Sequence, residues 1–290
     1  MRNKILYIHT ENLNFFYKLN KELNRQKINF KILSVGSKIA DFPSLVLTTL
    51  KEFNKFKRKY KNLKFLTYDE NSNFKYYILK VLAAYKTSYK DSYSALTVSI
   101  DPGSKKIGMV VFLDEYYLIS HTFYDKRAFI NSIKDYIDCF QNKNLNQLKL
   151  TFKFGSGILP LTLNLINIVR NIYQTNESLK IYLIDEAKSS KIKIQNRKKL
   201  FKTKHELSAL IIALRIGVEL RESDYLNNLL KNKSKGKNRG IEIVKNSKES
   251  SYSRKDIREL IEKIINDDIS LSQSYKLINK QNKQEKSIIL

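Results

Sequence analysis

The chain has 290 residues, a formal net charge of +26, and 42% hydrophobic and 28% charged residues, a composition that is typical of a folded domain and excludes a disordered one. No stretch reaches the roughly 20 apolar residues of a membrane span, the amino terminus lacks the apolar run of a signal peptide, and a single cysteine excludes an internal disulfide. The positive charge predicts a polyanionic partner, with nucleic acid the leading candidate, and a cytoplasmic, nucleoid-associated protein.

The charge is unevenly distributed and divides the chain into three segments. Residues 1–90 hold 19 basic and 6 acidic residues, residues 91–224 hold 20 and 14, and residues 225–290 hold 15 and 8. We expect chemistry that needs carboxylates to lie in the middle segment, which holds half of them. The three segments are interpreted as an accessory domain, a catalytic domain, and a basic linker with a helical hairpin.

Short apolar runs alternate with helical patterns in residues 1–90. Strands are predicted at 5–8, 30–35 and 63–68, helices around 16–23 and 76–85, and residues 46–56 are apolar but ambiguous. This alternation predicts a small parallel α/β domain. The segment has no glycine-rich phosphate loop, so we interpret it as a docking or DNA-contacting domain rather than a nucleotide site.

Residues 91–224 begin with three closely connected strands, which predict an antiparallel meander. The predicted elements are strands at 95–100, 107–113, 117–122, 148–154 and 179–184, and helices at 127–140, 161–173 and 204–221. Together they predict an α/β domain with a mixed five-stranded sheet and flanking helices. Beyond it, residues 231–239 are interpreted as a solvated basic linker, and helices at 253–266 and 271–279 as either a helix-turn-helix or a hairpin docked on the core.

Two acids stand at the ends of predicted strands in the middle segment. Asp101 follows an apolar strand and precedes Pro-Gly, so its carboxylate is expected on rigid backbone at the sheet edge, although a simple turn-forming role is equally open. Glu186 follows the strand at 179–184 in the same way, with Asp185 the competing ligand because strand alternation points it to the other face. A solvated acidic pair at a strand end stays the alternative.

The helix predicted at 204–221 places His205 and Glu206 in its first turn, near the strand ends. Glu206 could also serve only to stabilise the helix dipole. Three carboxylates can hold two Mg²⁺ ions, one activating water and one stabilising the leaving oxygen. We therefore predict Asp101, Glu186 and Glu206 as ligands of Mg²⁺ or Mn²⁺, with His205 as a further ligand or proton carrier.

Basic residues surround these acids and form the predicted nucleic-acid contact. Eight of them lie between Glu186 and Glu206 with no acid among them, and two more follow Asp101. A run of this kind is commonly a solvated face, but its place between two candidate ligands favours a contact with a phosphate backbone. The predicted contacts are Lys105, Lys106, Lys188, Lys191, Lys193, Arg197, Lys198, Lys199, Lys202 and Lys204.

These residues carry a resemblance to a known family. Residues 98–108 (VSIDPGSKKIG) look like the first motif of RNase H-like nucleases of the RuvC and YqgF group, which includes the Holliday junction resolvases. Residues 184–190 (IDEAKSS) and 205–213 (HELSALIIA) are similar to the second and third motifs, in the family's order, over about residues 95–222. In the family the last acid usually stands directly before the alanine, where this chain has Ser208.

The resemblance implies an RNase H-like fold, Mg²⁺- or Mn²⁺-dependent hydrolysis of phosphodiesters in branched DNA, roles in DNA recombination and repair, and a homodimer. Three rival interpretations stay open. The first is a nuclease of the same fold acting on structured RNA, such as precursor ribosomal RNA. The second is an actin-like ATPase or sugar kinase, which needs a second Asp-x-Gly phosphate turn; the nearest candidate, Gly155-Ser156-Gly157, lacks the Asp. The third is a non-catalytic nucleic-acid-binding protein on a degenerate nuclease fold.

Overall fold

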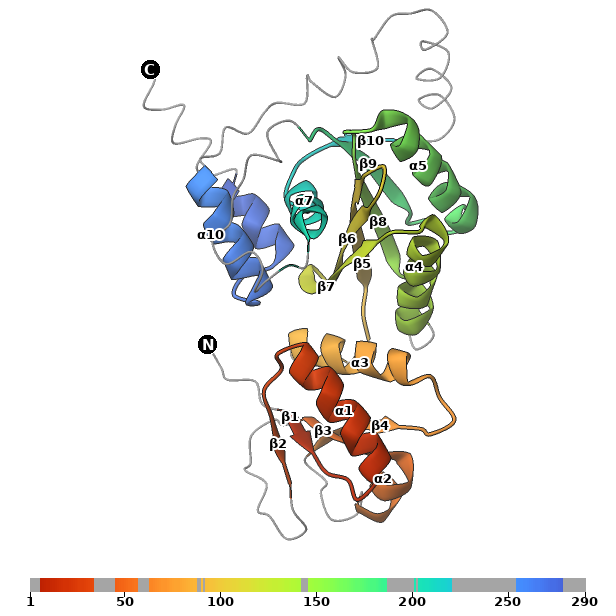
Figure 1. Cartoon of the computed structure of the whole chain (residues 1–290), viewed down its shortest axis with the longest axis vertical. Helices are drawn as coiled ribbons and strands as arrows, with labels where there is room; N and C mark the ends of the chain where they lie inside the picture. The colour runs from red at the N-terminus through yellow and green to blue at the C-terminus, as the bar shows by residue number, and fades with distance from the viewer. Residues whose placement is uncertain are drawn as a thin grey trace, which may run out of the picture. The chain divides into compact units, whose positions relative to one another are not determined.

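The chain folds into two compact units, Met1–Asp91 and Ser92–Leu290 (Figure 1). The computed structural model describes residues 6–33, 45–56, 63–87, 90, 92–141, 146–186, 201, 203–220 and 254–278. Within the described residues no helix is long and apolar enough to cross a membrane. Of the segment predicted as a basic linker with a helical hairpin, the structure describes residues 254–278, and the linker at 231–239 lies outside the described residues.

The first unit is built on a four-stranded parallel sheet with the strand order β2-β1-β3-β4. Its elements are β1 (Leu6–Ile8), α1 (Leu13–Arg25), β2 (Phe30–Ile32), β3 (Leu45–Thr49), α2 (Leu50–Phe56), β4 (Lys64–Tyr68) and α3 (Phe74–Lys86). The ambiguous stretch 46–56 is therefore a buried strand followed directly by a short helix. The predicted parallel α/β arrangement is present in the described part of this unit.

One apolar face packs helix α1 on the first sheet, and a side-chain cap fixes where the helix begins. Phe15, Leu19 and Leu23 recur at helical spacing and are fully buried. Asn12 starts the helix by accepting a hydrogen bond from the Phe15 backbone N–H at 3.0 Å. The Phe15 ring also stacks on Tyr68 from β4, with ring centroids 5.2 Å apart, so the helix is fixed across the sheet.

Glu52 joins the carboxyl ends of β1 and β3 in the first unit. Its buried carboxylate accepts hydrogen bonds from the Thr10 and Thr49 hydroxyls, at 2.7 and 2.6 Å, and from the Glu11 backbone N–H at 2.5 Å. Burial is the largest single influence and raises the pKa of Glu52, but the hydrogen bonds from Thr49, Thr10 and Glu11 together outweigh it and lower the pKa below its usual value. Glu52 therefore stabilises this unit as a carboxylate.

The stability of the first unit is expected to fall in acid because of Glu52. A carboxyl whose pKa is lowered by folding contributes stability above its unfolded pKa, and this contribution is lost as the pH falls through the folded pKa. Glu52→Gln should lower the free energy of unfolding at pH 7 by about 2 kcal/mol. In the variant, the free energy of unfolding should also fall less steeply as the pH drops below the usual pKa of glutamate. Urea unfolding of both proteins from pH 7 to pH 3 measures this; parallel curves at equal stability would contradict it.

The second unit contains a six-stranded mixed sheet with the strand order β10-β9-β8-β5-β6-β7. Strands β5, β6 and β7 form the predicted antiparallel meander, β8 and β9 run parallel to β5, and β10 is antiparallel to β9. The strands are β5 (Ala95–Pro102), β6 (Ile107–Leu113), β7 (Tyr116–Phe123), β8 (Lys149–Gly155), β9 (Lys180–Ile184) and β10 (Val218–Glu219). The prediction of an α/β domain with a mixed sheet is confirmed, with six strands in place of five.

Helices cover both faces of this sheet. Figure 1 shows α4 (Lys126–Gln141) and α5 (Leu159–Tyr173) on one side and α7 (Lys204–Ala213) on the other. The prediction of one long helix over 204–221 is wrong, because α7 ends at Ala213. Gly217 then lies against β9, where an added Cβ would come within 2.4 Å of the Leu183 carbonyl oxygen. This close approach brings the chain back to pair as β10, the sixth strand.

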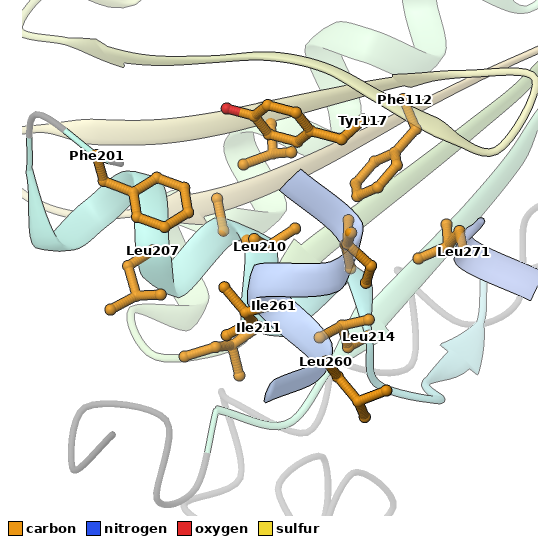
Figure 2. Packing of buried hydrophobic residues seen from close by; sticks show 14 of the residues in the cluster. Phe112, Tyr117, Phe201, Leu207, Leu210, Ile211, Leu214, Leu260, Ile261 and Leu271 are labelled. Atoms are coloured by element: carbon orange, nitrogen blue, oxygen red, sulfur yellow. The ribbon is translucent and has the colours of Figure 1, made fainter. Parts of the chain in front are cut away.

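The carboxyl-terminal hairpin, formed by α10 (Arg254–Ile265) and the helical residues 271–278, packs on α7. Figure 2 shows Leu260 and Ile261 beside Ile211 of α7 and Leu214, which follows α7, in one buried cluster that also includes Phe112 from β6. The two helices are therefore docked on the core through their apolar face, and a DNA-reading helix-turn-helix role stays a prediction.

Candidate functional site

Asp101 lies at the centre of the sheet edge in the second unit. It is the penultimate residue of β5, between β6 and β8, and only 8% of it is exposed. Strand β5 extends two residues beyond its predicted end at Ile100, because Asp101 and Pro102 still pair with β6. The carboxylate is thus carried by rigid backbone flanked on both sides.

His205 from the first turn of α7 contacts the Asp101 carboxylate directly. Its Nδ1 lies 2.8 Å from Asp101 Oδ2. Gly108 on β6 permits this approach, because an added Cβ there would come within 2.1 Å of the His205 carbonyl oxygen. The tight contact between α7 and the meander therefore brings these two side chains together.

Glu186 reaches the same sheet edge from the end of β9. Its Oε1 accepts a hydrogen bond from the Gly157 backbone N–H at 3.1 Å. A Cβ on Gly155 would lie 1.8 Å from Glu186 Oε1, and one on Gly157 would lie 2.5 Å from Oε2. The turn considered above as a phosphate loop therefore serves, in this structure, to make room for the Glu186 side chain.

Both carboxyl groups have pKa values above their usual range. Burial is the main cause for Asp101, and the hydrogen bond from His205 and the charge of Lys204 oppose it. Burial also raises the pKa of Glu186, followed by the negative charge of Asp101, while Arg215 opposes the increase. Two partly desolvated acids thus repel each other across this edge, an arrangement that a bound cation would relieve.

Glu206 does not join this pair. It is 1% exposed, and its carboxylate accepts hydrogen bonds from the Ser120 and Thr122 hydroxyls of β7, at 2.8 and 2.9 Å. Its backbone N–H is capped by Thr203 at 3.3 Å. The predicted three-carboxylate ligand set is therefore not assembled, because Glu206 is directed to β7, two strands away from Asp101 in the sheet.

The remaining donor set suits a hard divalent cation with open positions. Among the residues that the structure describes, no three His, Cys, Asp or Glu side chains are placed to hold a metal ion by themselves. Mg²⁺ needs only one or two carboxylates, because water and substrate phosphates complete its coordination. Asp101 and Glu186 supply two such groups, and the glycines at 155 and 157 keep space beside them, so these residues fit the predicted Mg²⁺ or Mn²⁺.

Three of the predicted basic contacts lie within the described residues. Lys105 and Lys106 occupy the turn between β5 and β6, and Lys204 starts α7, close enough for its charge to act on Asp101. Lys106 Nζ lies 5.0 Å from the ring centroid of Tyr124, which is 73% exposed. The other predicted contacts, Lys188, Lys191, Lys193, Arg197, Lys198, Lys199 and Lys202, lie outside the described residues.

Two basic residues near the site were not predicted from the sequence. Arg215 Nη1 donates a hydrogen bond to the Asp185 carbonyl oxygen at 2.5 Å, beside Glu186. Lys153 is buried within β8, two residues before Gly155. Neither residue carried a signal in the sequence: Lys153 alternates with Lys149 and Thr151 along its strand, as on a polar face, and Arg215 lay within the predicted long helix.

The comparisons with known proteins give only distant likenesses. No family model and no curated protein matches the chain. Among solved structures it is similar to an exopolyphosphatase from Cytophaga hutchinsonii, with 12% identity over 69% of this chain and 70% of that one and a TM-score of 0.15. It is also similar to two Ppx/GppA phosphatase family structures from Aquifex aeolicus, both with 10% identity and a TM-score of 0.13. One, a type II variant, matches over 70% of this chain and 72% of its own, and the other over 77% and 81%.

These comparisons correct the predicted family. All three structures are named as exopolyphosphatase or Ppx/GppA proteins, and none is a RuvC or YqgF nuclease. On this finding the predicted membership of that group is wrong, and so are the predicted cleavage of Holliday junctions and the roles in recombination and repair. TM-scores of 0.13 to 0.15 assign neither a fold nor an activity to this chain.

Proposed function

We propose that the second unit is a divalent-cation-dependent hydrolase that acts on a phosphoryl group of a polyanionic substrate. The observation that carries this proposal is the 2.8 Å contact between His205 Nδ1 and Asp101 Oδ2. The Glu186 carboxylate lies at the same edge of the sheet. Proton transfer and hard-cation binding are the two requirements of such hydrolysis, and this edge has residues for both.

The His205–Asp101 pair is suited to moving a proton. When Nδ1–H donates to Asp101, the neutral imidazole keeps Nε2 as an acceptor. Nε2 can take a proton from water as the water oxygen bonds to phosphorus, and can return it to the leaving oxygen as the second P–O bond breaks. A divalent cation at Asp101 and Glu186 would neutralise charge on the phosphoryl oxygens.

We also propose an RNase H-like arrangement for this unit, independent of membership of the RuvC and YqgF group. The support is the antiparallel meander β5-β6-β7, followed by β8 and β9 parallel to β5, with helices on both faces. In this arrangement the site residues lie where the carboxyl ends of β5 and β9 meet one edge. The predicted nucleic-acid partner and the predicted homodimer stay predictions.

Lys105, Lys106 and Lys204 are proposed to hold the polyanion beside this edge. All three follow or precede site residues closely in the chain, and the charge of Lys204 already acts on Asp101. Tyr124, exposed next to Lys106, offers an aromatic face at the same edge. Phosphate contacts of this kind make binding weaker as salt is raised.

The proposal is tested by hydrolysis assays with the full chain. We expect Mg²⁺ or Mn²⁺ to support hydrolysis of at least one of p-nitrophenyl phosphate, bis-p-nitrophenyl phosphate, inorganic tripolyphosphate and ATP, and EDTA to abolish it. The Lys105→Ala/Lys106→Ala variant should raise KM for the most highly charged substrate and reduce its salt dependence. Absence of cation-dependent hydrolysis across the panel would contradict the proposal.

A further inference from the structure

Lys153 places an ammonium group in the interior of the second unit. It is 8% exposed, and burial lowers its pKa to about 7. Among the described residues it forms no ion pair with a carboxylate. A buried cation without a counter-charge is costly unless hydrogen bonds replace its water, so the partners of Lys153 decide what it does.

The three N–H groups of Lys153 have three oxygen partners. Nζ donates to the carbonyl oxygens of Ala213 and Arg215, at 2.6 and 2.7 Å, and to Tyr275 Oη at 2.5 Å. The two carbonyls stand at the end of α7, where backbone acceptors have no partner within the helix. Lys153 therefore fixes the end of α7 to β8.

Tyr275 brings the carboxyl-terminal hairpin into this cluster. Its hydroxyl donates to the Ala213 carbonyl at 2.6 Å, and its ring lies 4.8 Å from Lys153 Nζ. The same hairpin packs its apolar residues on α7, as Figure 2 shows for Ile261 beside Ile211. We name Lys153, Tyr275 and the carbonyls of Ala213 and Arg215 the Lys153 cluster.

The other end of the cluster leads to the candidate site. Arg215, whose carbonyl Lys153 holds, donates through Nη1 to the Asp185 carbonyl, and the next residue is Glu186. The Glu186 carboxylate in turn accepts the hydrogen bond from the Gly157 backbone N–H. A continuous series of contacts thus runs from the hairpin to Glu186.

We propose that Lys153, Tyr275 and Arg215 are positioning residues through which the docked carboxyl-terminal hairpin holds Glu186 at the site. The inference rests on the proposed function insofar as Glu186 is a cation ligand there. It assigns the hairpin a part in assembling the site, in addition to covering α7. Loss of the Tyr275 hydroxyl should loosen both the hairpin and Glu186.

The test uses amide hydrogen exchange, measured by NMR on the full chain without metal. The Gly157 amide reports directly on the position of Glu186. Tyr275→Phe should accelerate exchange of the hairpin amides and of Gly157 by about tenfold each. Tyr173→Phe is the matched control, because the buried Tyr173 hydroxyl has no hydrogen-bond partner among the described residues, and it should leave both unchanged.

A second variant tests the order of the contacts. Arg215→Gln should accelerate Gly157 exchange while the hairpin stays protected, because it breaks the series between the cluster and Asp185. Unchanged Gly157 exchange in Arg215→Gln, or faster hairpin exchange with unchanged Gly157 exchange in Tyr275→Phe, would overturn the proposal.

Mn²⁺ titration separates this inference from the proposed function. Wild type should bind Mn²⁺, and Tyr275→Phe should bind it about tenfold more weakly, whereas Tyr173→Phe should match wild type. Wild type that binds no Mn²⁺ would overturn the cation-dependent function, and the exchange of Gly157 would still decide whether the hairpin holds Glu186.

Discussion

Asp101→Asn is expected to lower kcat/KM for the hydrolysed phosphate substrate by about 10³- to 10⁴-fold while the chain stays folded. Asparagine has nearly the same shape, so the β5 edge can remain intact. It removes one negative charge from the cation site and no longer favours the His205 tautomer with hydrogen on Nδ1. One substitution therefore weakens both the binding of the cation and the transfer of a proton through His205.

The measurement is a pair of steady-state assays on Asp101→Asn and on Asp138→Asn, with thermal unfolding of both. Asp138 lies exposed on α4, so its substitution removes the same charge away from the sheet edge and should leave kcat/KM unchanged. Because burial raises the pKa of Asp101, neutralising it should not destabilise the fold. Wild-type activity in Asp101→Asn would show that the hydrolysis occurs elsewhere.

Much of the second unit could be predicted because its strands are short apolar runs bounded by polar turns. Asp114 and Glu115 both have positive φ, 46° and 73°, which suits the two-residue hairpin turn that joins two strands of the predicted meander. Asp101 was placed at the sheet edge for a similar reason, since a polar residue after a buried run must reach solvent or a partner. Local pattern was sufficient for these features.

The direction of Glu206 could not be predicted from local pattern. Neighbouring helix residues point about 100° apart, so His205 and Glu206 cannot both face Asp101. Which of them does so depends on how α7 crosses the sheet, and that crossing is set by contact with Gly108, almost 100 residues earlier in the chain. The Lys153 cluster was hidden for the same reason, because Tyr275 lies 122 residues away.

Glu206→Ala is expected to lower the free energy of unfolding by about 3 kcal/mol, the largest effect on stability that we predict. The substitution removes the acceptor that the partly buried hydroxyls of Ser120 and Thr122 share and empties the space beside β7. Glu206→Gln keeps one acceptor and nearly all the volume, and should lose only about 1 kcal/mol. Urea unfolding of the three proteins measures both values.

Cation binding decides whether Glu206 is structural or a ligand. If it serves only to join α7 to β7, Glu206→Gln should bind Mn²⁺ as wild type does, whereas Glu186→Gln should lose at least tenfold in affinity. Thr122→Val provides the matching partner deletion, and in a double-mutant cycle with Glu206→Gln it should show coupling in stability and none in Mn²⁺ affinity. Loss of Mn²⁺ binding in Glu206→Gln without loss of stability would instead support Glu206 as a third carboxylate ligand. If the hydrogen bonds of Glu206 join α7 to β7, neutralising its carboxylate must weaken those hydrogen bonds and lower the stability.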